Sequence, residues 1–246
     1  MTPRTMGVLA GATLLALPAF AWAQEIGAAP PSPLITATGL ALLGLLPFLL
    51  VVTTSFAKMA VVLSILRSAL GTQNVPPNVV LASLAVILTG YVMAPVFSEM
   101  GDAAAPLLEL SAEEARDVSA WGERASPVIE PLRAFLAVNA GTAELAFFAE
   151  LRGLELDEAE QAPLSVVVPA FTITELSEAF QIGFLLFLPF LVLDLLIGSV
   201  LLSLGMHMLS PTSVSMPFKL LLFVLVNGWI VLSESLVLGY VYPGGG

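Results

Sequence analysis

Four apolar stretches, each about 20 residues long, constrain the fold of this chain more than any other feature. They cover residues 34–57, 79–98, 182–203 and 220–241. A helix needs about 20 apolar residues to cross the roughly 30 Å of hydrocarbon in a bilayer. The sequence therefore predicts an all-α membrane protein.

The composition supports the same class. Apolar residues make up 58% of the chain, charged residues 11%, and the mean hydropathy is +0.97. A soluble domain carries roughly 25% charged residues, so this chain has too little polar surface to cover itself in water. The absence of cysteine excludes disulfides, thiolate metal sites and cysteine nucleophiles, and His207 is the single histidine. We expect no metal site and no cofactor.

The first 23 residues have the three parts of an export signal. Arg4 supplies a positive charge, residues 6–20 are apolar, and Ala21-Trp22-Ala23 gives the small-x-small pattern that precedes cleavage. The interpretation is a cleaved signal peptide over residues 1–23, with an uncleaved anchor helix as the alternative. A Pro-rich linker at 24–33 follows.

Acidic residues are concentrated in one segment. Fourteen of the 19 acidic residues lie between Glu99 and Glu160, and the net charge of the chain is −11. A nucleic-acid surface would carry the opposite sign, so nucleic acid is excluded as a partner. The segment is either a solvated polar region or a docking site for a basic partner. Periodic apolar residues and a capping pattern at Ser111–Glu114 predict short amphipathic helices in it.

These features predict two long hydrophobic helical hairpins, at 34–98 and 164–246, with an acidic helical insertion at 99–163. Gly71 and the prolines at 76–77 mark the turn of the first hairpin. With the N-terminus outside the cytoplasm, Lys58, Arg67 and Lys219 would lie in cytoplasmic turns, as the positive-inside tendency favours. The acidic segment would then face the periplasm of a bacterial inner membrane.

Six charged residues in or beside the apolar stretches are candidate buried polar or assembly residues. Asp194 would cost roughly 2.5–3.5 kcal/mol at the centre of an isolated helix in lipid, so it should face protein or water. It either bonds a neighbouring helix or serves an ion or proton pathway, and Glu234 has the same two interpretations. The other four are Glu175, Glu178, Lys58 and Lys219.

Met206, His207 and Met208 follow the third apolar stretch. Two methionines in such a place are ordinary apolar filler in most proteins. Methionine is also deformable enough to form a seal that opens around varied contents, and hydrophobic constrictions gate pores. Residue spacing does not decide between these interpretations.

Several motifs in one order resemble the FliP family of flagellar export proteins and its injectisome counterparts, the SctR family. Besides Glu175, Asp194 and Gly228-Trp229, they are residues 54–58, 66–78, 93–97, 168–171, 179–184, 188–190, 205–206 and 217–224. The resemblance covers nearly everything after residue 34. Three residues depart from the family pattern: His207 replaces a methionine, Asn227 an aspartate and Lys58 an arginine.

The resemblance implies a pore-forming core subunit of the flagellar type III export gate, built from several copies with FliQ-like and FliR-like subunits beside FlhB-like and FlhA-like proteins. Unfolded protein substrates would pass through it, and the bulk of the assembly would lie toward the periplasm in the flagellar basal body. Met206, His207 and Met208 would form the gate of the resting pore.

Two other functions fit the sequence less well. An injectisome export subunit of the SctR type is the first alternative, and a stand-alone ion-coupled transporter is the second. With four apolar stretches and no visible inverted repeat, the transporter is disfavoured. We do not expect an enzyme, because the chain lacks a recognisable phosphate-binding loop or catalytic constellation.

Overall fold

The computed structural model describes residues 44–45, 47–72, 75–108, 118–154 and 162–243. The chain divides into two compact units, Met1–Pro47 and Phe48–Gly246. In the first unit the described residues are helical. The predicted signal peptide, the linker and the capping pattern at Ser111–Glu114 lie outside the described residues.

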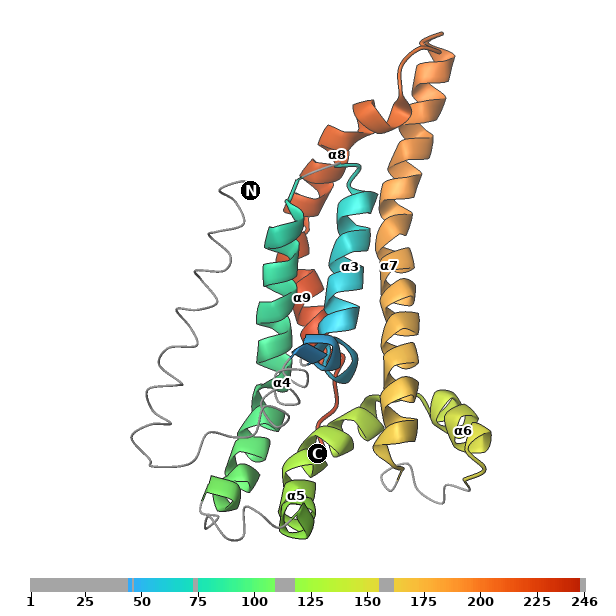
Figure 1. The fold of residues 1–246 in the computed structure, drawn as a ribbon. Helices are drawn as coiled ribbons and strands as arrows, with labels where there is room; N and C mark the ends of the chain where they lie inside the picture. Colours follow the sequence, from blue (N-terminus) through green and yellow to red (C-terminus); the bar gives the residue numbers. More distant parts are fainter. Residues whose placement is uncertain (1–43, 46, 73–74, 109–117, 155–161, 244–246) are drawn as a thin grey trace, which may run out of the picture. The chain divides into compact units, whose positions relative to one another are not determined.

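The second unit is built from helices throughout its described part, which confirms the all-α prediction (Figure 1). Their bounds are α3 Phe56–Ala69, α4 Asn78–Leu108, α5 Val118–Asn139, α6 Thr142–Leu151, α7 Leu164–Ser203, α8 Pro211–Leu225 and α9 Gly228–Leu238. Helices α3, α4, α7 and the α8–α9 pair run alongside one another, and α5 and α6 lie at one end of them (Figure 1).

Within the described residues, two helices, Asn78–Pro106 and Leu164–Ser203, are long and apolar enough to cross a membrane. The number of possible spans there rises to five if each bent helix pair counts as one. The second predicted stretch lies within α4, and the third forms the later part of α7. The arrangement as two membrane hairpins and the periplasmic position of the acidic segment stay predictions.

The first and fourth apolar stretches are not straight helices. The chain bends by 82° between the helix that ends at Thr53 and α3, and by 62° between α8 and α9. Hydroxyls of Thr53 and Thr54 bond the carbonyls of Leu49 and Leu50, a local bond typical of helix bends. Asn227 has a left-handed backbone with φ 51°, which asparagine tolerates better than most residues.

These helix bounds correct the predicted positions of two lysines. Lys58 lies in the first turn of α3 and Arg67 in its last turn, so both belong to a helix and not to a loop. Lys219 lies inside α8, not in the turn before it. Both lysines are buried, because Lys58 pairs with two carboxylates of α7 and Lys219 pairs with one.

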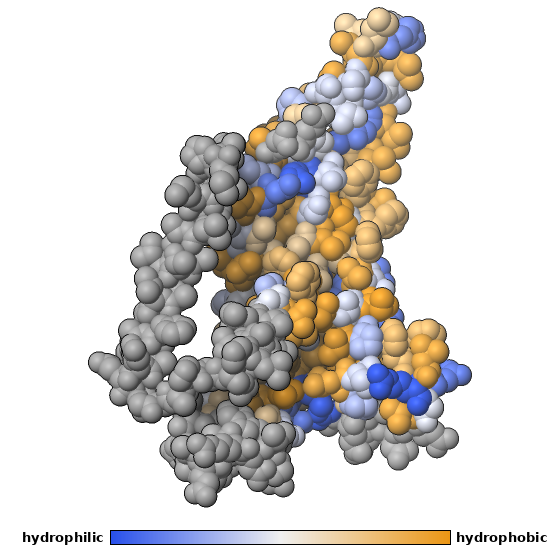
Figure 2. All heavy atoms as spheres, in the orientation of Figure 1, coloured by the Kyte–Doolittle hydropathy of each residue, from blue (hydrophilic) through white to orange (hydrophobic). Residues whose placement is uncertain are grey.

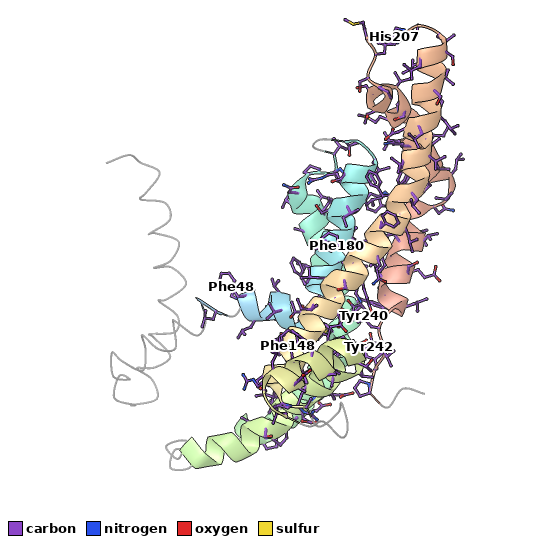
Figure 3. All side chains as sticks on the ribbon, turned by 90° about the vertical axis from the view of Figure 1, so that its right-hand side faces the viewer. Phe48, Phe148, Phe180, His207, Tyr240 and Tyr242 are labelled. Atoms are coloured by element: carbon purple, nitrogen blue, oxygen red, sulfur yellow. The ribbon has the colours of Figure 1, made fainter. Side chains whose placement is uncertain are left out.

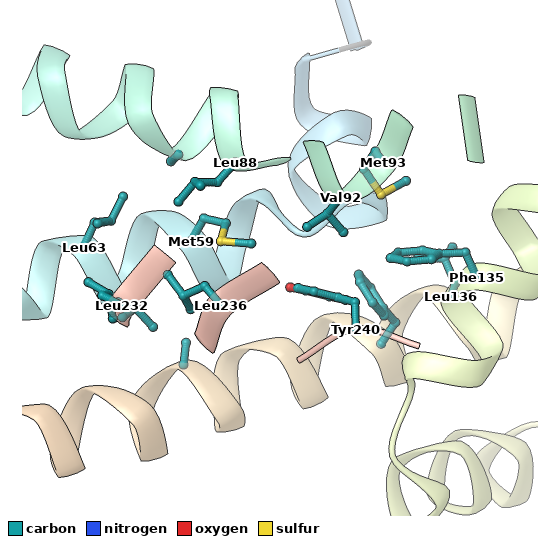
Figure 4. Packing of buried hydrophobic residues seen from close by; sticks show 14 of the residues in the cluster. Met59, Leu63, Leu88, Val92, Met93, Phe135, Leu136, Leu232, Leu236 and Tyr240 are labelled. Atoms are coloured by element: carbon teal, nitrogen blue, oxygen red, sulfur yellow. The ribbon is translucent and has the colours of Figure 1, made fainter. Parts of the chain in front are cut away.

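The core forms where apolar residues recur at helical spacing. Met59, Val62, Leu63 and Leu66 lie on one face of α3 and are fully buried against neighbouring helices. Figure 4 shows Met59 and Leu63 packed with side chains of α4 and α9. At Gly183 of α7 a Cβ would collide with Ile65, so glycine allows α3 and α7 to approach closely.

Much of α7 nevertheless keeps its apolar side chains exposed, and hydrophobic residues cover wide areas of the visible surface (Figure 2). The exposed residues of α7 include Phe180, Phe184, Leu185, Leu195, Leu196 and Val200. Apolar surface on this scale marks contact with a membrane or with other proteins.

Candidate functional site

A buried ion cluster joins α3 to α7. The Lys58 ammonium lies 2.8 Å from Glu175 Oε1 and 2.6 Å from Glu178 Oε2. The side chains of Lys58 and Glu175 are 4% and 1% exposed, whereas Glu178 is 46% exposed. Because residues three apart share a face of a helix, both carboxylates of α7 reach the same lysine. Two carboxyl groups therefore face one ammonium in this cluster.

Tyr240 completes this cluster from beyond the end of α9. Its hydroxyl donates a hydrogen bond to Glu175 Oε2, and the Lys58 ammonium lies 4.2 Å from the centre of its ring. Tyr240 is itself buried, so its phenol and the buried Glu175 carboxyl satisfy each other's hydrogen-bonding groups. Tyr240 is not among the site residues predicted from the sequence; the available signal was an aromatic residue just after an apolar helix.

The segment around Tyr240 is tied to two other helices. Asn139, the last residue of α5, donates to the Val241 carbonyl at 2.8 Å and accepts from the Val241 N–H at 2.9 Å. The hydroxyl of Tyr242 donates to the Val92 carbonyl of α4 at 2.9 Å. Rings of Phe135 and Tyr240 stack with centroids 5.9 Å apart. Figure 3 labels Tyr240 and Tyr242 in this region.

A second ion cluster joins α7, α8 and the end of α3. The Lys219 ammonium lies 2.7 Å from Asp194 Oδ2 and donates to the Ala69 carbonyl at 3.1 Å. The other oxygen of Asp194 accepts a hydrogen bond from the Ser215 hydroxyl. These bonds favour the interpretation that Asp194 bonds a neighbouring helix over an ion pathway. Ser215 and the Ala69 carbonyl were not foreseen, because neither stands out in a hydropathy pattern.

Glu234 joins neither cluster. It lies exposed on α9, in a groove shared with α4, and has no hydrogen bond or ion pair within the described ranges.

Met206, His207 and Met208 form the tip of the turn between α7 and α8. All three are exposed, and Met208 is 98% exposed. Gly205 starts the turn with φ 74°, a left-handed conformation that suits glycine. The tip lies at the end of the helices away from Tyr240, as Figure 3 shows for His207.

The part of the chain that the structure describes has no group of three or more His, Cys, Asp or Glu side chains arranged to hold a metal ion. What the two clusters do chemically is to hold helices together: one fixes α3 against α7, and the other fixes α8 against α7 below the exposed tip.

The model of the FliP family matches residues 40–236, a range that includes both lysines, their carboxylates and the tip. The chain is similar to the flagellar biosynthetic protein FliP of Caulobacter vibrioides, with 42% identity over 98% of this chain and 92% of that protein. It is also similar to the Yop proteins translocation protein R of Yersinia pestis, with 43% identity over 82% of this chain and 93% of that protein. FliP of Bacillus subtilis is 42% identical over 78% of this chain and 84% of its own length.

Proposed function

This chain belongs to the FliP family, and on that premise we propose that it is a pore-forming core subunit of the flagellar type III protein export gate. Unfolded flagellar subunits would cross the inner membrane through the pore. The observation that carries the proposal is the match to a flagellar FliP over 98% of this chain.

The structure supports the pore role in two ways. Wide apolar surface on α7 calls for lipid or neighbouring subunits, as expected of one subunit in a membrane assembly. The methionine-rich tip between α7 and α8 is exposed, so it is available to meet the same tip of other copies in a deformable seal. We propose Met206, His207 and Met208 as the gate, in an assembly with FliQ-like and FliR-like subunits and FlhB-like and FlhA-like export proteins.

We place the assembled protein in the bacterial inner membrane, with its bulk toward the periplasm, as part of the flagellar basal body. In this proposal the ion clusters around Lys58 and Lys219 are assembly and positioning groups. Energy for export would come from partner proteins and the proton gradient.

An injectisome subunit is the second candidate, because the similarity to Yop proteins translocation protein R reaches 43% identity. A stand-alone ion-coupled transporter has weaker support, because Asp194 is bonded to Lys219 and Ser215.

The test is a strain that lacks this gene, with the gene restored as the control. Loss of motility together with loss of hook and filament proteins from the medium is the expected result. Loss of a different set of secreted proteins, with normal flagella, would support the injectisome role instead. Unchanged secretion of every protein would refute both export roles.

A further inference from the structure

A groove of ≈ 590 Å³ runs between α4 and α9 on the outside of the helices. Its lining residues are Leu88, Tyr91, Trp229, Ile230, Ser233, Glu234, Val237 and Leu238. Several of these apolar side chains are largely exposed, among them Tyr91, Ile230 and Leu238. Exposed apolar walls of this kind need lipid or another helix to cover them.

Glu234 puts a carboxylate into this apolar groove. It is the single charged residue of α9, and the lining contains no lysine, arginine or histidine. Each of the three carboxylates of α7 pairs with a lysine: Glu175 and Glu178 with Lys58, and Asp194 with Lys219. Glu234, in contrast, pairs with no cation within the described ranges. A carboxylate among residues that face a membrane is costly, and such groups face protein and pair with an opposite charge.

We propose that an apolar helix of a different subunit occupies this groove and places a lysine or arginine against Glu234. Its apolar side chains would cover Ile230 and Leu238. Its cation would meet the carboxylate in a groove that also contains the aromatic side chains of Tyr91 and Trp229, and the faces of aromatic rings attract cations. The inference rests on one part of the proposed function, namely that the chain is a subunit of a membrane assembly. It does not depend on the role of the chain in a pore.

A second copy of this chain is a poor source of that cation. The lysines within its apolar helices, Lys58 and Lys219, are buried and already paired. Arg67, in the last turn of α3, bonds Asn78, and Arg133 bonds Glu130 on α5. Arg152 is exposed, but it follows the short helix α6 and lies outside the two described helices that are long and apolar enough to cross a membrane. The occupant is therefore a subunit with a basic residue inside an apolar helix.

The test uses the tagged full-length chain in its own bacterium, with the complex measured on native gels and the chain's abundance measured in membranes. E234K should abolish the complex through like-charge repulsion, and E234Q should reduce it by about tenfold or more. E150K is the matched control: Glu150 is an exposed carboxylate on α6, outside the groove, and the same charge change there should leave the complex intact.

The deciding step is charge reversal in the partner. Each basic residue in the apolar segments of every subunit of the complex, this chain included, is changed in turn to glutamate in the E234K background. Recovery of the complex by one change in another subunit supports the proposal. A normal complex with E234K, recovery by a change in this chain, or no recovery at all would overturn it.

These outcomes are separate from the test of the proposed function. If the gene deletion left secretion unchanged while E234K still broke the complex and a partner change restored it, the export role would fail and the groove assignment would stand.

Discussion

Replacing Lys219 by methionine is expected to destabilise the protein by about 3 kcal/mol. Methionine keeps an unbranched side chain of similar length, so the packing of α8 is largely preserved. The ammonium is lost, and with it the 2.7 Å ion pair to Asp194 and the 3.1 Å bond to the Ala69 carbonyl.

The magnitude follows from what is left behind. Removing one partner of a buried ion pair costs about 3–5 kcal/mol, because the other charge stays without compensation. The Lys219 side chain is 2% exposed, but Asp194 is 23% exposed, so water relieves part of the cost and the lower end of the range applies.

Thermal unfolding of the purified chain in detergent, followed by tryptophan fluorescence, measures the effect. A change of 1 kcal/mol shifts the midpoint by about 2–4 °C in a chain of this size, so about 3 kcal/mol predicts a drop of about 6–12 °C. Adding Asp194→Asn to Lys219→Met removes the orphaned charge and should restore most of the loss. A decrease of less than about 2 °C in the unfolding midpoint for Lys219→Met alone would refute the reasoning.

Three further predictions use other contacts. Gly228→Ala should destabilise by about 1–3 kcal/mol in the same assay, because the new Cβ collides with the ring of Phe223; adding Phe223→Leu should relieve it. Tyr240→Phe should cost about 1–3 kcal/mol, because Oε2 of the buried Glu175 carboxylate loses the Tyr240 hydroxyl that donates to it; an unchanged midpoint would mean that this hydrogen bond contributes nothing. His207→Met replaces a polar ring by an apolar, deformable side chain at the proposed gate, so it should reduce the ion leak through the resting pore; a leak equal to that of the unchanged protein would refute a role of His207 in the seal.

The helical class and the family could be predicted from the sequence, because both depend on residues that are close together along the chain. Long apolar stretches gave the helices, and the motif order gave the resemblance that the family match confirms. Helix α3 ends at Ala69 and α4 begins at Asn78, and glycine and proline predicted a break between these residues.

The sites could be predicted only as a set of unusual residues, not as contacts. Lys58 was placed in a loop because a charge commonly ends an apolar stretch, yet it lies inside the bundle because two carboxylates of α7 pair with it. The dipeptide Asn227-Gly228 is typical of turns, but the residues on both sides of it are apolar. The prediction of one continuous stretch at 220–241 therefore missed the bend between α8 and α9. An ion pair between residues far apart in the sequence produces no pattern in the residues around either partner, whereas the periodicity of a helix does.

The cluster around Lys58 also sets an order of events during synthesis. Lys58 precedes Glu178 by 120 residues, and Tyr240 follows Glu175 by 65 residues. At about 5–20 residues per second, the lysine is made about 6–24 s before Glu178 exists to pair with it. For that time the nascent chain carries an unmatched cation at the start of an apolar helix. We therefore expect water or the insertion machinery to keep α3 out of the lipid until α7 is made.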